Sequence, residues 1–380
     1  MRNVGRVFFI VAMLIIVSSS IQAQKAFLLL GERLNYGLPL PIYTLYDAQN
    51  RQMVLAQDGE IRWFDDVKRP PVKVAKIKEV PRFDFSPEEQ KAIDDARKSH
   101  QAMFGDIPPN FFESATLIQR PGGKEFCLTD RDSKFYFYST ETGELVRKVF
   151  IEKPKHKFAP KITMLSDDNK IVLTQSTTLS KTYVHSMETG KLLIEVNSGI
   201  LDSAGLSTDG STLFLLHDNN VLSRYSTKTG KKSAPDLTIN AESAGNIVVS
   251  PAGGVIAFNL YSKGDSNGQA IINLQTNELV VCDSTLKKFS TLAFTPDGKF
   301  LAVHRPKYIH FIETTTGKHS FSYNAGYPDL WDTVIDPSFS PDSTKISFRP
   351  AGGIDIKLPY YVYCDLSQPR KKLVDKLGPS

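Results

Sequence analysis

The chain is poor in the residues that mark metal-binding and redox sites. It has only three cysteines in 380 residues. Cys127, Cys282 and Cys364 are far apart and form no CxxC pair, which argues against a structural zinc site. Each lies in an apolar, strand-like run, so we expect buried thiols that pack as small hydrophobic residues. The odd number leaves open a reactive thiol or an intermolecular bridge in an exported protein.

Motifs of the common enzyme classes are also missing. The sequence contains no GxSxG elbow, HExxH pair, P-loop or dinucleotide fingerprint. Of the seven histidines, His304 and His310 flank one predicted hairpin and could approach each other, but two histidines alone make a poor metal site. Asp130-Arg131-Asp132 resembles a chelating pair, yet it falls in a tight turn, where Asp is favoured for turn geometry. We therefore expect no metal and no cofactor.

The charge is mild and mixed. Charged residues make up 23% of the chain and the formal net charge is +5. Without Arg2 and Arg6, which lie in the N-terminal segment, it falls to about +3. A nucleic-acid-binding protein normally presents a clustered basic face. The sequence therefore predicts no nucleic-acid partner.

Only one long hydrophobic run is present. Val7–Val17 follows Arg2 and Arg6 and precedes a polar, small-residue stretch that ends at Ala23. About 11 apolar residues are too few to span a bilayer, and this order of segments is typical of a secretory signal peptide. We expect cleavage after Ala23, so that residues 1–23 are a signal peptide and 24–380 a single periplasmic or secreted domain without a membrane span.

The chain does contain a sequence repeat. Its clearest copy, Leu292–Ser320, reads as an apolar strand, a Pro-Asp-Gly turn, two more strands and a Thr-Gly turn before a fourth strand. The first turns lie 41 to 46 residues apart, a spacing that suits four-stranded propeller blades. They fall at Pro121-Gly122-Gly123, Asp167-Asp168-Asn169, Thr208-Asp209-Gly210, Pro251-Ala252-Gly253, Pro296-Asp297-Gly298 and Pro341-Asp342-Ser343.

A less regular copy of the repeat precedes these six copies. Its strands are predicted at Ile42–Tyr46, Gln52–Ala56, Glu60–Phe64 and Val72–Lys78. The sequence therefore predicts an all-β fold, a single β-propeller of about seven four-stranded blades, with six or eight left open. Ala26–Leu30 and Lys371–Val374 are candidates for the strands that close the ring. The first strands of the clear copies are predicted at Ala115–Gln119, Ile162–Leu165, Ala204–Ser207, Ile247–Ser250, Leu292–Thr295 and Pro337–Ser340.

One segment, 81–113, interrupts the repeats between the first and second blades. Ser86-Pro87-Glu88-Glu89 is a capping box with Pro at the first helical position, and Gly105 ends the pattern. A short helix is therefore predicted over Pro87–Phe104. It is interpreted either as a latch packed on the rim or as a lid or partner-docking element.

The repeats resemble those of known propeller families. FTPDGKFLAV and FSPDSTKISF look like the WD-repeat, YVTN and TolB-like propellers, and the likeness covers nearly all of the mature chain. The Gly-His and Trp-Asp dipeptides of WD repeats are absent, and only Trp63 and Trp331 are present. The YVTN-like and TolB-like group is therefore the better comparison. The resemblance implies an exported propeller that binds other proteins.

Two loops on one face are the candidate binding regions. Pro-Asp-Gly and Thr-Gly turns share one face of a propeller, so second-to-third loops and blade links share the other, where binding sites usually lie. The link Tyr323–Asp336 carries an aromatic and acidic group that could anchor a protein or glycan, or in which Trp331 could instead plug the blade junction. The group is Tyr323, Tyr327, Trp331 and Asp332, with Asp329 and Asp336 beside it.

A second link, Glu152–Lys161, is basic. Lys155, His156 and Lys157 lie within it and could hold an acidic partner or an anionic glycan, although such a run is also typical of a solvated loop. Tyr261–Gln269 and Arg349–Leu358 are predicted as irregular polar loops of the same face.

Two function classes remain. The first is a non-enzymatic module that binds a protein or glycan, acting as a monomer. The second is a propeller enzyme, a lactonase or lyase, which needs carboxylates, amides or histidines on the inner strands. The predicted inner strands offer hydroxyls instead, which favours the binding module. These hydroxyls belong to Thr163, Ser207, Ser250, Thr295 and Ser340.

Overall fold

The structure is a computed structural model, and it describes most of the repeat region. The described residues are 27–28, 41–56, 58–65, 70–81, 87–88, 91, 94–95, 116–118, 123–130, 133–152, 161–166, 170–176, 181–197, 201–262, 265–282, 290–305, 308–324, 333–351 and 362–366.

The described strands form seven antiparallel sheets of four strands each, numbered here in chain order. The first is β2 (Pro41–Tyr46), β3 (Gln52–Ala56), β4 (Glu60–Phe64) and β5 (Lys73–Lys76); the second is β6 (Thr116–Ile118), β7 (Glu125–Thr129), β8 (Lys134–Ser139) and β9 (Leu145–Phe150). The third is β10 (Lys161–Leu165), β11 (Ile171–Ser176), β12 (Lys181–Ser186) and β13 (Leu192–Asn197); the fourth is β14 (Leu201–Leu206), β15 (Thr212–His217), β16 (Val221–Ser226) and β17 (Lys232–Thr238).

The fifth sheet is β18 (Ser243–Val249), β19 (Val255–Ser262), β20 (Asp265–Asn273) and β21 (Leu279–Val281). The sixth is β22 (Ser290–Phe294), β23 (Phe300–Arg305), β24 (Tyr308–Glu313) and β25 (His319–Asn324). The seventh is β26 (Thr333–Phe339), β27 (Lys345–Ala351), β28 (Val362–Asp365) and the N-terminal β1 (Phe27–Leu28).

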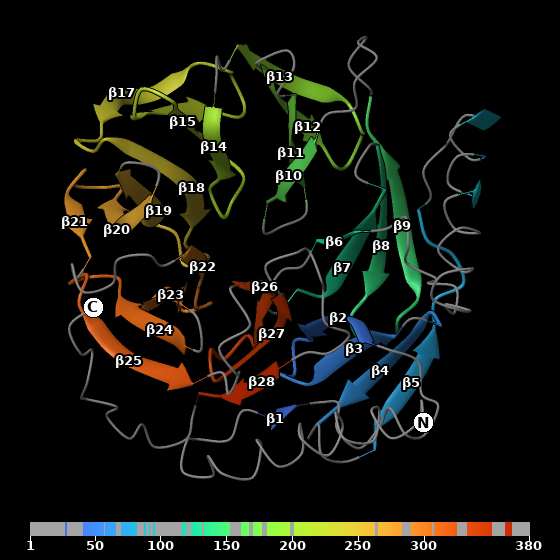
Figure 1. Cartoon of the computed structure of the whole chain (residues 1–380). Coiled ribbons are helices and arrows are strands. Elements are labelled where there is room, and N and C mark those ends of the chain that lie inside the picture. Colours follow the sequence, from blue (N-terminus) through green and yellow to red (C-terminus); the bar gives the residue numbers. More distant parts are fainter. Residues whose placement is uncertain are drawn as a thin grey trace.

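The sheets are arranged as in a β-propeller. They surround a common axis, with the first strand of each sheet innermost and the fourth at the rim (Figure 1). The predicted all-β repeat architecture is thus confirmed. No helix long and apolar enough to cross a membrane occurs among the described residues.

The seventh sheet combines both ends of the described chain. β1 pairs antiparallel with β28, with Phe27 opposite Tyr363 and Leu28 opposite Val362. The predicted closing role of Ala26–Leu30 is thereby confirmed for Phe27 and Leu28. The other predicted closing segment, Lys371–Val374, lies outside the described residues.

Two of the innermost strands begin well before their predicted first residues. β26 begins at Thr333 rather than Pro337, and β14 begins at Leu201 rather than Ala204. Each contains a register shift, between Ile335 and Ser338 in β26 and between Leu201 and Ser203 in β14. A bulge adds an unpaired residue and breaks the apolar alternation, so the half of the strand before it was not recognisable in the sequence.

A further prediction was wrong. Tyr261–Gln269 is not an irregular loop, because β19 and β20 continue their pairing to Ser262 and Asp265. The polar residues in this ribbon hid its strand character. Of the other predicted loop, 349–351 belong to β27 and the rest lies outside the described residues.

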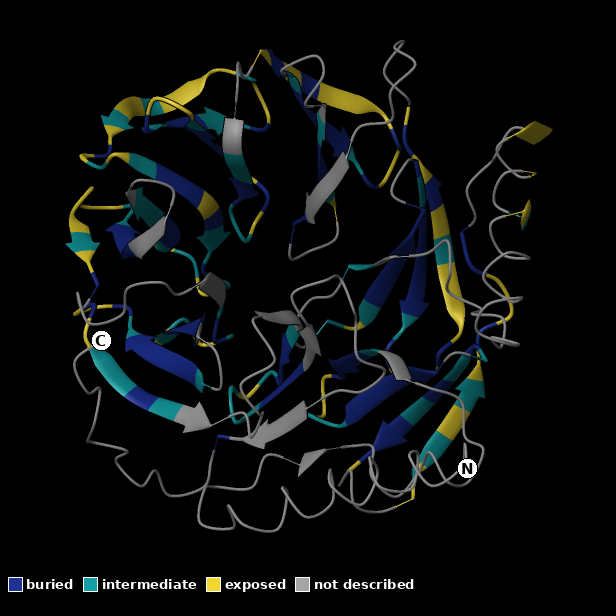
Figure 2. Ribbon diagram, in the orientation of Figure 1, coloured by how far each residue is buried: buried dark blue, intermediate teal, exposed yellow. Residues whose placement is uncertain are grey.

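Apolar side chains fill the spaces between consecutive sheets. Six buried clusters join the first sheet to the second and so on to the seventh, and buried residues occupy the middle of the ring wall while exposed ones follow the rim (Figure 2). Because no sheet buries its own apolar face, the stability of each depends on its neighbours.

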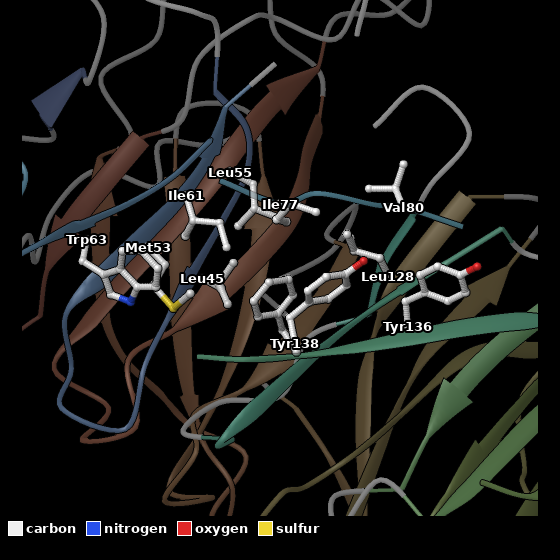
Figure 3. Close-up of a cluster of buried hydrophobic side chains, with 11 residues drawn as sticks. Leu45, Met53, Leu55, Ile61, Trp63, Ile77, Val80, Leu128, Tyr136 and Tyr138 are labelled. Carbon is white, nitrogen blue, oxygen red and sulfur yellow. The ribbon is translucent and has the colours of Figure 1, made fainter. Parts of the chain in front are cut away.

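The first of these clusters shows how neighbouring sheets are joined. The fully buried Trp63 of β4 packs among aliphatic side chains and donates a hydrogen bond from Nε1 to the Thr140 carbonyl at 2.8 Å (Figure 3). Tyr138 of β8 donates its hydroxyl to the carbonyl of Glu79. Both polar atoms of these large side chains thus bind the backbone of the neighbouring segment, as buried polar groups require.

Polar groups join the seventh sheet to the first. Within the described residues, no buried apolar cluster spans this contact. The hydroxyls of Thr44 and Ser347 lie 2.9 Å apart. Asn50 accepts a hydrogen bond from the Asp342 amide at 3.0 Å and, through its carbonyl, one from the Lys345 ammonium at 3.3 Å. This polar contact, called the seam below, brings together residues from the two ends of the repeat region.

The predicted insertion at 81–113 is described only in part. Pro87, Glu88, Lys91, Asp94 and Asp95 have helical backbone, but no complete helix is defined by them. The remaining residues from 82 to 113 lie outside the described part.

Candidate functional site

Most of the predicted binding residues lie outside the described part of the chain. Tyr327, Trp331, Asp332, Lys155, His156 and Lys157 all do so. Tyr323 is located in β25 with its backbone opposite Ile309, and its side chain is not described. The strands that flank the two links nevertheless determine where these links begin and end.

Both links begin after an outermost strand and end at an innermost strand. One joins β25, the outermost strand of the sixth sheet, to β26, the innermost of the seventh; the other joins β9 to β10 in the same way (Figure 1). Alternating strand direction puts all such links on the face opposite the Pro-Asp-Gly and Thr-Gly turns. We call these the link face and the turn face. One link joins the sixth sheet to the seventh and the other joins the second to the third, so they arise from non-adjacent pairs of sheets.

The turn face is held together by recurrent side-chain hydrogen bonds. In three repeats a Ser or Thr hydroxyl donates to the Asp two residues later at 2.6 Å: Ser207 to Asp209, Thr295 to Asp297 and Ser340 to Asp342. The same carboxylates accept backbone amide hydrogens at about 3.0 Å. These hydrogen bonds lower the pKa of all three carboxyls, against the opposing effect of burial.

Turns of neighbouring sheets also bind one another. Thr208 donates its hydroxyl to the carbonyls of Ser250 and Pro251, at 3.0 and 3.1 Å. The Asp297 amide donates to the hydroxyl of Ser343 at 3.1 Å. Many polar groups of the turn face are therefore engaged in joining the sheets.

The hydroxyls predicted on the inner strands have structural roles. Ser207, Thr295 and Ser340 each accept a hydrogen bond from a backbone amide five residues later, besides donating to an Asp. Ser250 is completely buried under the next turn. The side chain of Thr163 is not described. Within the described part, none of the hydroxyls predicted on the inner strands is paired as a nucleophile with a general base.

The predicted approach of His304 to His310 does not occur. His304 opposes Ile309 and Val303 opposes His310, so the two histidines lie on opposite faces of their hairpin. His304 is buried on the side toward the seventh sheet, and burial lowers its pKa to about 4.

His310 has a different partner, which the sequence analysis missed. Its Nδ1 lies 2.7 Å from the hydroxyl of Ser322 and 3.5 Å from Nε2 of His319, and Ser322 is also 2.7 Å from that Nε2. The serine has one hydrogen to donate, so one ring nitrogen accepts it and the other donates to the serine oxygen. Counting the register back from the Thr-Gly turn would have suggested the pair, but a bulge between Phe311 and Ile312 alters that count.

A second polar chain crosses the fourth sheet. Ser223 donates to Asp236 at 2.9 Å and lies 3.1 Å from Nε2 of His217, while Lys232 donates to Asp236 at 2.6 Å. Serine, not histidine, occupies the middle of this chain, and Ser223 is 2% exposed. A catalytic triad needs histidine in the middle and an accessible serine. The arrangement instead ties the edge strand β17 to its sheet.

The remaining candidates behave as structural residues where they are described. Asp130 accepts the amide hydrogens of Ser133 and Lys134 at 3.0 and 2.9 Å, which confirms its predicted turn role. Cys127 and Cys282 are buried thiols, and burial raises the pKa of Cys127, so the prediction of buried cysteines is confirmed for these two. The side chain of Cys364 is not described.

Among the described side chains no three His, Cys, Asp or Glu residues lie close enough to hold a metal ion. A scan against protein-family models found no match, and a search of curated proteins found no similar sequence.

Proposed function

We propose that the chain is an exported, non-enzymatic β-propeller that binds a protein or glycan partner through its link face. In this proposal residues 1–23 are a signal peptide that is removed. The seven sheets act as the blades of one closed ring, and 81–113 forms a helical insertion between the first and second blades.

The observation that supports this proposal is the difference between the two faces. On the turn face, aspartates, hydroxyls and backbone groups recur at equivalent positions and bind one another within and between sheets. The links do not repeat in sequence or length. In a repeat scaffold the irregular loops are the usual place for recognition, because they vary without disturbing the core.

The two links supply complementary recognition chemistry. Tyr323, Tyr327 and Trp331 offer flat apolar surfaces with polar edges, which suit a protein anchor or the face of a sugar ring, and Asp332 adds an acceptor. Lys155, His156 and Lys157 would attract acidic groups. In this proposal the partner would bind over the mouth of the ring, because each link ends at an innermost strand.

Affinity capture from an envelope extract tests the proposal. Four baits would be compared. They are wild type, Trp331→Ala, a double variant with Lys155→Ala and Lys157→Ala, and a matched double variant of the turn face with Lys228→Ala and Lys318→Ala. Lys228 and Lys318 are exposed, and both lysine pairs remove the same net charge from the protein.

We expect one set of partners to be retained by wild type and by the turn-face pair. Capture should fall by at least tenfold for Trp331→Ala, the effect of losing a central aromatic anchor. A glycan array probed with the same proteins would distinguish sugar from protein recognition. Equal capture by all four baits would contradict the proposal.

A further inference from the structure

The outermost strand of the second sheet exposes large apolar side chains. On β9, Leu145 is 38% exposed, Val146 52% and Phe150 56%. These values are high for side chains of this size, and the strand carries a long exposed stretch at the rim (Figure 2). We call these three residues the β9 strip.

The chain leaving the first sheet is fastened beside this strip. Lys148 of β9 lies 2.7 Å from both carboxylate oxygens of Glu79, and the Tyr138 hydroxyl binds the Glu79 carbonyl. Val80 is buried among the side chains between the two sheets (Figure 3). The segment that begins at residue 82 therefore starts at the second sheet.

Phe150 faces the side on which that segment starts. Its ring lies edge-on to Tyr136 at 6.5 Å between centroids, and the Lys148 ammonium lies 4.8 Å from the same Tyr136 ring. Lys148 is the residue that holds Glu79. Phe150, Lys148 and Glu79 consequently share one side of the sheet.

The chain must also return to the same sheet. Residues 82–115 connect Pro81, near the rim, to Thr116 at the start of the innermost strand β6. Four sheet strands span only about 15 Å, whereas an 18-residue helix is about 27 Å long. The connection is thus much longer than its end points demand and has ample length to lie along β9.

The described part of the connection shows a polar side turned to solvent. Pro87, Glu88, Lys91 and Asp95 have helical backbone and are exposed. Glu88, Lys91 and Asp95 follow Pro87 by one, four and eight residues, which places all four on one side of a helix. The apolar Ala92, Ile93 and Ala96 fall at helical positions outside that side. An amphipathic segment of this kind requires an apolar surface to cover it.

We propose that the β9 strip is the docking surface for the apolar side of residues 86–104 of the same chain. Tethering at Glu79 keeps this segment at high effective concentration next to the strip, which favours it over any free partner. Three side chains also form too small a surface for a stable contact between two copies, which needs about 1,200 Å² or more in total. The docked segment would cover the junction between the first and second sheets from outside.

Limited trypsin digestion of the whole protein tests the docking. Lys91, Arg97 and Lys98 supply cleavage sites within the segment. Phe150→Ser removes the most exposed member of the strip, while Leu193→Ser removes a 46%-exposed leucine from β13, the outermost strand of the third sheet. We expect Phe150→Ser to speed cleavage in the segment about tenfold and Leu193→Ser to leave it unchanged, since cleavage follows the population of the undocked form.

A double-mutant cycle adds a test that does not depend on the size of a single effect. If Phe150 and Ile93 contact each other, the Phe150→Ser and Ile93→Ser double variant should be cleaved little faster than either single variant. The Leu193→Ser and Ile93→Ser combination should match Ile93→Ser alone. Thermal melts of all variants would show that each is folded.

Two results would overturn the proposal. One is equal cleavage of wild type and Phe150→Ser, with the segment equally accessible in both. The other is a dimer, measured by light scattering at micromolar concentration, that Phe150→Ser dissociates, since the strip would then belong to a contact between two copies.

Discussion

The six contacts between consecutive sheets and the seam differ in chemistry. The first six bury apolar clusters such as that of Phe311, Phe321 and Phe339 between the sixth and seventh sheets. At the seam, the described side chains meet through hydroxyls, an amide and a lysine. Hydrogen bonds also join consecutive sheets, as from Thr208 to Ser250, so the difference within the described residues is the buried apolar cluster that the seam lacks.

The difference follows the order of the chain. Apolar contacts between consecutive sheets close short loops, but Thr44 and Ser347 are 303 residues apart. Such long-range contacts carry the largest cost in chain entropy and form late in folding. A hydrogen-bonded seam, with β1 added to the seventh sheet, specifies one register for the two ends of the repeat region.

The largest effect should come from an apolar contact. Phe311 is fully buried and stacks on Phe321 at 4.5 Å between ring centroids. Phe311→Ala should lower the free energy of unfolding by about 3–5 kcal/mol, because a buried ring is replaced by a cavity. Denaturant unfolding would measure it. A loss below that of Ser347→Ala at the seam would contradict the comparison.

Protonation of His304 should weaken the same contact. Burial lowers its pKa to about 4, below the value near 6.5 expected in the unfolded chain. The stabilisation from neutral His304 is therefore complete above pH 6.5 and is lost as the pH falls toward 4, by about 3 kcal/mol in total. His304→Gln should flatten the pH dependence of stability in this range.

That flattening should be incomplete, because burial also lowers the pKa of His185. Denaturant unfolding at several pH values for wild type, His304→Gln and the double variant with His185→Gln separates the two. An unchanged slope in His304→Gln would show that its environment stays accessible to protons.

Two turn glycines, one in a Thr-Gly turn and one in a Pro-Ala-Gly turn, allow a test of close backbone contact between sheets. Gly190 has φ of 72°, and a Cβ added there would lie 2.0 Å from the carbonyl oxygen of Phe150 in the preceding sheet. Gly253 has φ of 73° and no atom within 4 Å of such a Cβ. Gly190→Ala should lower the free energy of unfolding by about 2–4 kcal/mol and Gly253→Ala by about 1 kcal/mol. Both alanines would be strained by the left-handed backbone, but only the alanine at 190 would also clash with a neighbouring atom.

Chemical denaturation of the two glycine variants would measure this difference. Equal losses would mean that the second and third sheets tolerate a shift at this turn.

The smallest effect is expected at the seam. Thr44→Val and Ser347→Ala should each cost about 1 kcal/mol, and their double-mutant cycle should give a coupling of about 1 kcal/mol, as for a buried neutral hydrogen bond. Unfolding in urea would provide the values. A coupling near zero would show that the two hydroxyls do not stabilise the seam through each other.

The fold could be predicted from the sequence because its turns are local. Pro296-Asp297-Gly298 and Glu188-Thr189-Gly190 contain the residues that their backbone geometry requires, and Gly298 and Gly190 indeed have positive φ. The N-terminal halves of the inner strands could not be predicted, because bulges interrupt their alternation. Pairing of His310 with His319 was hidden for the same reason.

The candidate site was less predictable than the fold. Sequence alone identified the links as irregular, and the structure locates their flanking strands, but recognition by Trp331 or Lys155 depends on how side chains converge near the axis. Composition does not contain that information. The sequence also showed the hydroxyls of Ser207, Thr295 and Ser340 in place of carboxylates on the inner strands, but only the structure revealed their hydrogen bonds to the turn aspartates.

The most direct test of the account is amide hydrogen exchange of the chain, alone and bound to the material captured from an envelope extract. The account predicts slower exchange on binding in the links 153–160 and 325–332, with exchange at the turns 296–298 and 315–317 unchanged. Protection confined to the turns would contradict the assignment of binding to the link face.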